Sequence, residues 1–357
     1  MHVAPRAAPS HPPPAPRAGV QPRQLPPHAV RIHPRQSTPV RIGRGFGHAL
    51  SLRGHVGYPT VRVRLVEPFG AGGGPDLIAR ALSAKLSEIW GQPVVVENHP
   101  GAGSTAGPAL VAKSPADGQT LLVSTSAQAY SATLRKNLPY DPLTDFVPVA
   151  PLTLQPYVLV AGRHAKFRTV AELIKAAKAA PGTLRFASTG VGTGTHLGVE
   201  KFNLEAGIQA VHVSAAPGEG IADVIAATVA GRAHYQMVPI ELALADIRSG
   251  KLYALGVTGA RRSVLLPEAP TIEEAGVSAF VFQIWYGVWA PTGTPPAVIN
   301  RLSRDIARAL AAPEVKDLLA SHGAEPMSMT QPEFARFVVD ESKKATAIAE
   351  AVGVTPQ

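Results

Sequence analysis

Short hydrophobic runs alternate with longer amphipathic segments from about residue 58 to the end of the chain. In the first part of the chain, the runs typical of buried strands cover residues 64–69, 93–97 and 119–124. A segment with helical periodicity extends from Pro75 to about Trp90, Gly91 follows it, and a shorter helix is expected from Ser104. Proline at the first helical position and glycine directly after the last are preferred at helix ends. Strands that alternate with helices predict a parallel, wound α/β sheet.

A second set of segments repeats this alternation. A helix is expected at about residues 169–180, and the chain from Pro296 onward is mostly helical. The expected strands cover residues 184–187, 210–213, 234–238 and 253–257. A chain of 357 residues commonly divides into two lobes, because single hydrophobic cores stop growing near ~250–300 residues. We expect lobe one to comprise residues 58–158 and 259–357, and lobe two residues 159–258. The chain returns to lobe one near residues 254–259, so that two strands form a hinge.

Residues 1–57 differ from the rest of the chain in composition. They are rich in Pro, Arg, His and Ala and lack hydrophobic periodicity, so we expect them to be disordered. No apolar core of 7–15 residues follows the basic start, which does not match a secretory signal. Our preferred interpretation is a start assigned too far upstream; the alternative is a targeting or tethering tail.

The net charge of +9 is concentrated in that same segment, which contains eight arginines and no acidic residue. Residues 58–357 are therefore close to neutral, whereas a nucleic-acid-binding domain would be expected to carry a basic stripe with interleaved aromatic residues. There is no cysteine, so thiol chemistry is excluded. No apolar run approaches the ~18–20 residues that span a bilayer. We expect no nucleic-acid partner.

Two glycine-rich loops, each between an expected strand and an expected helix, are the strongest candidates for a binding site. Loop one covers residues 70–74 and loop two residues 189–194. Such loops present unpaired backbone N–H groups beside the positive end of a helix dipole, which favours an anion. Ligands of open α/β sheets bind at the carboxyl ends of strands. One loop alone is as well explained by a tight turn; two in matching positions favour a carboxylate site.

Loop one also permits a different reading, as part of a dinucleotide site. Gly70 and Gly72 follow a strand and precede a helix, and Glu97 ends the next strand. Against this, Pro75 occupies the third fingerprint position and Asp76 adds negative charge where a pyrophosphate would lie. The nucleotide signal is weak, and no cofactor is expected.

The remaining chemical candidates are better explained by structure than by catalysis. His196 begins a helix, where a histidine is more often a hydrogen-bonding group than a catalyst, and the twelve histidines form no convincing metal-ligand spacing. The sequence contains no G-x-S-x-G elbow and no paired carboxylates typical of acid–base catalysis. Trp285 and Trp289 lie on an aromatic strand, where core packing is favoured over ligand stacking for at least one of the two. These observations favour binding over chemistry.

Ordered motifs across the chain resemble the substrate-binding family of the tripartite tricarboxylate transporters, the Bug receptors. The resemblance is carried by residues 64–76, 92–98, 100–103, 117–122, 138–146, 187–197, 250–263, 270–276 and 290–295. It implies an α/β, two-lobed fold like the type II periplasmic binding proteins, with a ligand cleft between the lobes and a two-strand hinge. It further implies a periplasmic, monomeric receptor that delivers a small carboxylate to separate membrane permease subunits and catalyses no reaction.

The resemblance also implies which residues bind the ligand. These are Phe69, Gly70, Ala71, Gly72, Gly73 and Asp76 from loop one, Thr125 and Ser126 at a neighbouring strand end, and Thr193, Gly194, Thr195 and His196 from loop two. Asp76 either meets an amino group of the ligand or caps the helix, and His196 supports loop two. The ligand is a di- or tricarboxylate, an aromatic acid or an amino acid.

Two departures from the family pattern are expected to lie near the cleft or hinge. Residues 214–218 replace the usual Pro-Tyr/Phe-Lys-Gly turn, and His234 replaces an acidic residue. The alternatives to a transport receptor are an NAD-binding enzyme that uses loop one and a ligand sensor that docks on a signalling partner.

Overall fold

The computed structural model describes residues 58–101, 104–216 and 220–354. The expected disorder of residues 1–57 and the departure at residues 217–218 lie outside the described residues. The described residues form one compact unit by their internal contacts.

A mixed sheet organises the described part of the chain. Its strand order is β2-β1-β3-β9-β4-β7-β5-β6, and β8 and β10 also pair with β4. The strands are β1 (Val63–Glu67), β2 (Val94–Asn98), β3 (Thr120–Thr125), β4 (Phe146–Gly162), β5 (Arg185–Ser188), β6 (Val211–Ser214), β7 (Tyr235–Pro239), β8 (Leu252–Val257), β9 (Gln283–Pro291) and β10 (Glu325–Pro326). The parallel pairing expected from the sequence is present at both ends of the sheet, where β1 pairs with β2 and β3, and β5 with β6 and β7. The middle differs, because β4 and β9 run antiparallel to their neighbours.

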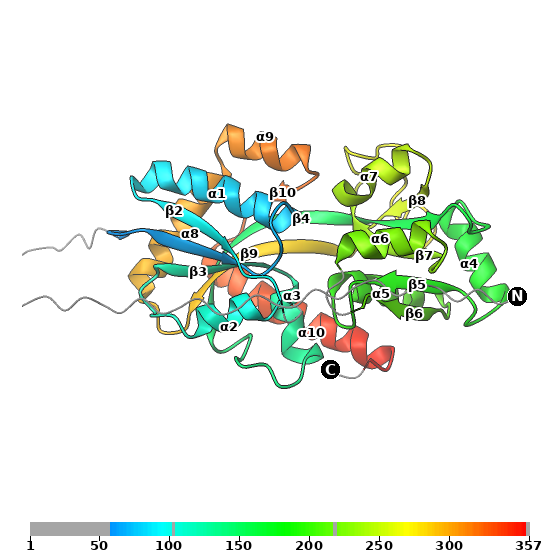
Figure 1. The fold of residues 1–357 in the computed structure, drawn as a ribbon, viewed down its shortest axis with the longest axis horizontal. Coiled ribbons are helices and arrows are strands. Elements are labelled where there is room, and N and C mark those ends of the chain that lie inside the picture. The colour runs from blue at the N-terminus through cyan, green and yellow to red at the C-terminus, as the bar shows by residue number, and fades with distance from the viewer. Residues whose placement is uncertain (1–57, 102–103, 217–219, 355–357) are drawn as a thin grey trace, which may run out of the picture. The chain divides into compact units, whose positions relative to one another are not determined.

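Lobe one is built on β1, β2, β3 and β9, and lobe two on β5, β6, β7 and β8 (Figure 1). The helices of lobe one are α1 (Gly74–Trp90), α2 (Ala106–Ala112), α3 (Ala127–Leu134), α8 (Pro296–Leu310), α9 (Pro313–Ser321) and α10 (Gln331–Ala351). Those of lobe two are α4 (Val170–Ala179), α5 (Gly194–Ala206), α6 (Ile221–Val229) and α7 (Ile240–Arg248).

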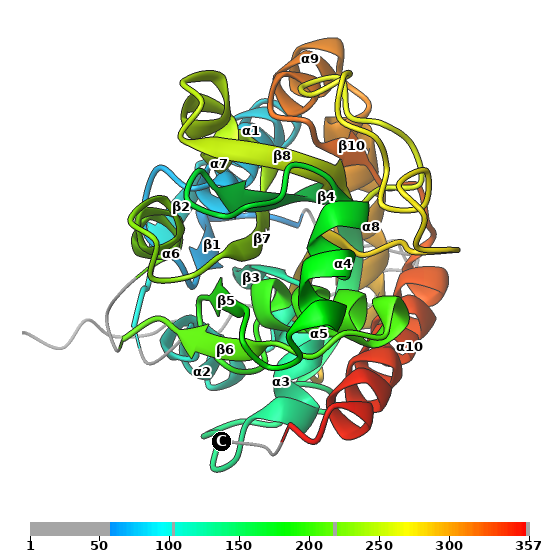
Figure 2. The ribbon, with the colours of Figure 1, turned by 90° about the vertical axis from the view of Figure 1, so that its right-hand side faces the viewer.

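Helices cover both faces of the sheet. In lobe one, the apolar side chains of α1 and α8 pack with β1 and β9 in one cluster that includes Leu82 and Ile306. In lobe two, α6 and α7 cover one face of the strands, and α4 and α5 the other (Figure 2). The largest cluster is continuous through both lobes and includes Leu122 and Phe202. Trp285 and Trp289 are 1% and 0% exposed, which confirms their expected core packing.

Strand β4 connects the lobes and was not expected from the sequence. It pairs with β9 and β10 in lobe one and with β7 and β8 in lobe two. Its register against β9 shifts between Pro148 and Ala150 and again between Pro151 and Leu154. Proline cannot donate to a ladder and is accommodated in strands at bulges or edges, so these shifts accompany the prolines. Because prolines interrupt its hydrophobic pattern, this strand of 17 residues was not predicted from the sequence.

The chain crosses back to lobe one beside Tyr157. The Tyr157 N–H donates to the Thr258 Oγ1 at 2.8 Å, and the Phe282 N–H donates to the Thr258 carbonyl at 3.0 Å. After Thr258 the chain first packs along β8, through a parallel bridge between Val257 and Thr271, before it enters β9. The exact division of the lobes and the hinge motion stay predictions.

Candidate functional site

Loop one is held in shape by Asp76, in the first turn of α1. Its Oδ2 accepts hydrogen bonds from the Gly72 N–H at 2.8 Å and the Arg80 Nε at 2.9 Å, and its Oδ1 accepts one from the Asn98 Nδ2 at 3.0 Å. Burial raises the pKa of this carboxyl, but the hydrogen bonds from Arg80, Gly72 and Asn98 outweigh burial and lower it below its ordinary value. Because these donors engage both oxygens, the geometry favours a role in fixing loop one over contact with a ligand amine.

The rest of loop one is accessible. Phe69 and Gly73 are partly buried, whereas Gly70, Ala71 and Gly72 are exposed. Gly73 is the N-cap of α1, and Gly74 is its first residue. Loop one therefore presents backbone to the surface, beside the N-terminus of a 17-residue helix.

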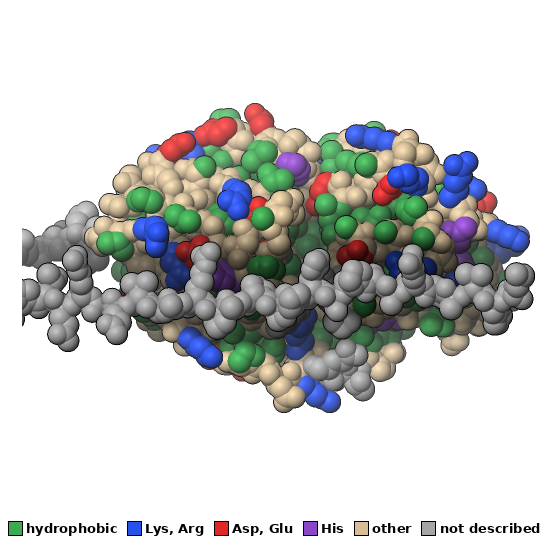
Figure 3. All heavy atoms as spheres, in the orientation of Figure 1, with side chains coloured by type: hydrophobic (Ala, Val, Ile, Leu, Met, Phe, Trp, Pro, Cys, Tyr) green, Lys and Arg blue, Asp and Glu red, His purple; other side chains and the backbone are tan. Residues whose placement is uncertain are grey.

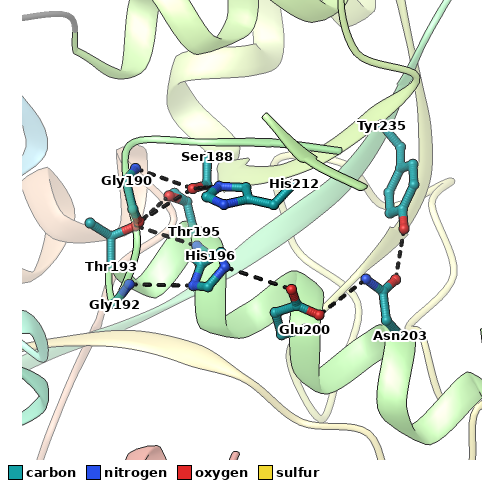
Figure 4. A network of polar contacts seen from close by, with 10 residues as sticks. All are labelled: Ser188, Gly190, Gly192, Thr193, Thr195, His196, Glu200, Asn203, His212 and Tyr235. Atoms are coloured by element: carbon teal, nitrogen blue, oxygen red, sulfur yellow. Dashed lines mark hydrogen bonds and ion pairs between the residues drawn. The ribbon is translucent and has the colours of Figure 1, made fainter. Parts of the chain in front are cut away.

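Loop two is organised by side-chain hydrogen bonds around the start of α5 (Figure 4). The Thr193 hydroxyl, at the N-cap, donates to the Gly190 carbonyl at 2.7 Å and accepts from the His196 N–H at 3.4 Å. The Thr195 hydroxyl accepts from the Thr189 N–H at 3.1 Å, and the His196 Nδ1 accepts from the Gly192 N–H at 3.3 Å. His196 thus supports the loop from behind rather than facing outward.

Two histidines, the buried His196 and the half-buried His212, lie under loop two. The rings of His196 and His212 are 4.2 Å apart, and the His212 Nε2 lies 2.6 Å from the Ser188 Oγ. Burial lowers the pKa of His196 to about 3, with a smaller contribution from His212, and burial lowers the pKa of His212 to about 4. Both rings are therefore neutral at pH 7. Since the His196 Nδ1 is an acceptor, its proton resides on Nε2, which lies 3.6 Å from the Glu200 Oε1.

Loop two faces the carboxyl end of β3 across a small cavity. Thr125 and Ser126 lie at this strand end, both almost fully buried, and the Thr125 Oγ1 accepts from the Ala127 N–H at 3.2 Å. The cavity has a volume of about 30 Å³, room for one or two water molecules. It is lined by Ser104, Thr105, Ser124, Ala127, Gln128, Ser131, Arg135, Tyr140, Gly192 and Thr193.

Two tyrosine hydroxyls mark the first residues of the two site helices. A Cβ added at Gly74 would lie 3.3 Å from the Tyr286 Oη, and one added at Gly194 would clash with the Tyr157 Oη. Burial raises the pKa of both phenols well above the ordinary value, and for Tyr286 the nearby Glu241 and Tyr157 add to the effect. Within residues 58–101, 104–216 and 220–354, neither hydroxyl has a hydrogen-bond partner.

Two carboxyl groups lie close to these hydroxyls. The Glu241 Oε1 would be 3.1 Å from a Cβ at Gly74, so this residue of α7 in lobe two reaches α1 in lobe one. Glu67, at the end of β1, is 0% exposed; its Oε2 accepts from the Asn98 Nδ2 at 2.7 Å. The Glu67 Oε1 has no hydrogen-bond partner within the described ranges. Burial raises the pKa of each carboxyl to about 7.

Sequence reasoning located the two loops but missed Tyr157, Tyr286 and Glu241. Tyr286 lies within the aromatic strand that was assigned to the core, and the other two lie in segments without a local signal. His234 is not where it was expected. It precedes β7, its Nδ1 accepts from the Arg185 N–H at 2.9 Å, and Arg185 begins β5. In this parallel pair, the site lies at the opposite, carboxyl end, so its expected proximity to the cleft is wrong.

The described residues also bear on a dinucleotide site, a metal site and a membrane span. Glu97, the acidic residue of the dinucleotide reading, forms a two-pronged ion pair with Arg64, at 2.9 and 2.7 Å. The part of the chain that the structure describes contains no group of three metal-ligating side chains. Nor does any of its helices combine the length and apolar character needed to cross a membrane. On the face in Figure 3, basic and acidic side chains are interspersed.

Comparison with known proteins identifies the family. The family model described as "Tripartite tricarboxylate transporter family receptor" matches residues 78–354. Protein BugT of Bordetella pertussis is 37% identical over 300 residues, covering 83% of this chain and 90% of that protein.

Solved structures agree with this match. The R. palustris Rpa4515 structure with adipate has a TM-score of 0.76 and 32% identity, covering 84% of this chain and all of that chain. The MatC structure from Rhodopseudomonas palustris with bound malate has a TM-score of 0.71 and 29% identity, covering 82% and 99%. The periplasmic binding protein BugD has a TM-score of 0.73 and 29% identity, covering 84% and 100%. The fold is therefore the two-lobed α/β fold of periplasmic solute-binding proteins, and the chain belongs to the tripartite tricarboxylate transporter receptor family, the Bug receptors.

Proposed function

We propose that this protein is a periplasmic receptor that captures a small carboxylate and delivers it to the membrane permease subunits of a tripartite transporter. Its ligand is a di- or tricarboxylate, an aromatic acid or an amino acid. Similar structures bear on the ligand class, since two are described with adipate and with malate. One relative is described as a periplasmic binding protein, which supports the compartment.

One observation carries the proposal: two helix N-termini, each with a tyrosine hydroxyl against its first residue. Gly74 and Tyr286 form this arrangement at loop one, and Gly194 and Tyr157 form it at loop two. Unpaired N–H groups and the positive end of a helix dipole favour an anion, and a phenol hydroxyl donates one further hydrogen bond. Such a site holds a carboxylate by neutral donors.

In this proposal the ligand-binding groups come from three places. Loop one supplies backbone at residues 69–73, the end of β3 supplies Thr125 and Ser126, and loop two supplies residues 193–195. Asp76 and His196 position the loops, because their polar atoms are engaged by backbone N–H groups of Gly72 and Gly192.

Binding is coupled to closure of the lobes. The cavity of about 30 Å³ between loop two and β3 is far smaller than the ~300 Å³ of a typical ligand pocket, so a ligand enters when the lobes separate. Contacts to both loops exist only in the closed form, and the ligand shifts the population toward it. Small-angle scattering of the full chain tests this step: a saturating ligand should reduce the radius of gyration, and an unchanged curve would count against it.

The protein carries out no chemistry in this proposal and acts as a monomer. The rival from another class is an enzyme that binds NAD through loop one. Pairing of Glu97 with Arg64 counts against it, because that carboxylate is the group a dinucleotide site would use on the ribose.

The first experiment is a thermal-shift screen of the full chain. The panel contains malate, adipate, citrate, aromatic acids, amino acids and NAD(H). A ligand at 100 times its Kd stabilises the native state by about 2.7 kcal/mol, which is a readily measured shift. Stabilisation by a carboxylate supports the receptor; stabilisation by NAD(H) alone refutes it, and so does no response to any carboxylate.

A second experiment separates transport from sensing. The liganded full chain, immobilised on a resin, is used to capture partners from membranes solubilised from its own host. Ligand-dependent recovery of polytopic permease subunits supports transport. Recovery of a signalling protein instead would favour the sensor.

A further inference from the structure

Glu241 is the acidic side chain that lobe two places against the start of α1. It is the second residue of α7, and its Oε1 lies against Gly74 and near the Tyr286 hydroxyl, both in lobe one. Its charge also raises the pKa of Tyr157. The hydroxyl of Tyr157 contacts Gly194 at the start of α5. Glu241 therefore lies among the same donors that are proposed to hold the ligand.

No positive charge compensates this carboxyl in the described structure. Its pKa is raised to about 7 because burial disfavours the charged form, and only its own backbone N–H opposes that effect. The titratable groups that face it are the phenols of Tyr157 on β4 and Tyr286 on β9. His322, the C-cap residue of α9, lines a cavity of about 10 Å³ together with Gly74.

A second carboxyl group, that of Glu67, adds negative charge near Glu241 and Tyr286. Glu67 of β1 acts on the same Tyr286 phenol, and its Oε1 is fully buried without a hydrogen-bond partner among the described residues. Arg80, whose charge acts on Glu67, donates its hydrogen bonds to Asp76 and Asn98. Like charges close together in a poorly hydrated site disfavour each other's ionised forms. A second carboxylate placed here would meet two acidic groups and no cation.

We propose that Glu241 selects a ligand that carries an ammonium group as well as its carboxylate, so that the site prefers amino acids to hydroxy acids of the same skeleton. This inference rests on the proposed carboxylate receptor and narrows its ligand class. The helix N-termini and the tyrosine hydroxyls hold the carboxylate, and Glu241 accepts a charge-assisted hydrogen bond from the ammonium group. Glu67 contributes to the field without contacting the ligand.

Matched ligand pairs isolate the amino group. Titration calorimetry on the full chain compares aspartate with malate, glutamate with 2-hydroxyglutarate, alanine with lactate, and phenylalanine with 3-phenyllactate, with adipate as a reference carboxylate. In whichever pairs bind, the amino acid is expected to bind at least tenfold more tightly. Equal or tighter binding of the hydroxy acids overturns the proposal.

The variant Glu241→Gln keeps the shape of the side chain and removes its charge. It should weaken the amino acid at least tenfold and leave the hydroxy acid unchanged or bound more tightly. The control is Glu268→Gln, an exposed carboxylate outside the site, which should change neither affinity. Equal loss for both members of a pair would mean that Glu241 only supports the fold, and it would overturn the selective role.

The pH dependence gives an independent readout. An ammonium group binds best to ionised Glu241, so the affinity for the amino acid should rise between pH 6 and 8, and Glu241→Gln should flatten that rise. Affinity that falls with pH would indicate that a protonated carboxyl donates to an anionic ligand, which contradicts the proposal.

The carboxylate receptor and the selective role of Glu241 can be refuted separately. Binding of adipate or a hydroxy acid, with no preference for amino acids, refutes the role of Glu241 and leaves the carboxylate receptor intact. No binding of any carboxylate refutes both.

Discussion

Replacing Gly194 with alanine tests the contact between α5 and the Tyr157 hydroxyl. The added methyl group would clash with the Tyr157 Oη, while the Cζ and Cε2 atoms of the same ring lie at 3.4 and 4.0 Å, which is ordinary contact. The ring is 2% exposed and stacks on Phe282, so it has little room to move. Overpacking of this kind costs about 1–3 kcal/mol of the free energy of unfolding.

The substitution Tyr157→Phe removes only the clashing atom. In that background, alanine at residue 194 should be neutral or stabilising by up to ~1 kcal/mol, since alanine favours a helix more than glycine does. The expected coupling between the two sites is therefore at least about 1 kcal/mol, within the range measured for residues in contact. Urea unfolding of the four proteins measures it. If Gly194→Ala changes the free energy of unfolding equally in both backgrounds, the close approach of this hydroxyl is refuted.

Further expectations concern the loops and their electrostatics. Burial depresses the pKa of His196 to about 3 and of His212 to about 4, so the unfolded chain takes up protons first as the pH falls. The free energy of unfolding should therefore fall between pH ~6.5 and 4 by roughly 1.4 kcal/mol per pH unit per histidine. In urea unfolding, His212→Gln should reduce that slope. An unchanged slope would contradict the burial of the His212 ring. Asp76→Ala should lower the free energy of unfolding by about 1–3 kcal/mol and weaken ligand binding in calorimetry, because the Gly72 N–H that fixes loop one loses its acceptor. Unchanged affinity would deny Asp76 a positioning role. Glu97→Gln should cost at most about 1 kcal/mol in urea unfolding and leave carboxylate affinity unchanged, because its partner is the half-exposed Arg64; lost affinity would implicate it in the site.

Local signals sufficed where a residue's role is set by its near neighbours in the chain. The helix that begins with Gly74 ends at Trp90, and Gly91 adopts the left-handed conformation that closes it, as the pattern indicated. His196 was expected to support loop two, and its Nδ1 accepts the Gly192 N–H four residues earlier. Both arrangements involve contacts within one helical turn, which sequence spacing specifies directly.

Signals failed where a structural role depends on contacts far away in the sequence. Strand β4 contains Pro148, Pro151 and Pro156, which break the usual strand pattern, and it is stabilised by pairing with β9 more than a hundred residues later. His234 was expected near the cleft or hinge, but it precedes β7, and the direction of that strand puts it at the end opposite to Pro239. Direction within a sheet is a property of topology, which no short window of sequence contains.

Gly74 and Gly194, which begin the two site helices, differ from the other glycines of the chain in the reason why a glycine is needed. The positive backbone angles found at many glycines of this chain are absent from Gly74 and Gly194, so neither is required for backbone freedom. At Gly194 the Tyr157 hydroxyl occupies the space of a Cβ, and at Gly74 a Cβ would lie tightly against the Glu241 Oε1 and the Tyr286 Oη, at 3.1 and 3.3 Å. From the sequence, both read as ordinary turn glycines; in the fold, each admits a phenol donor to the N-terminus of a helix. A carboxylate site made from backbone and tyrosine is therefore visible only after β4 and β9 bring Tyr157 and Tyr286 to the two helix starts.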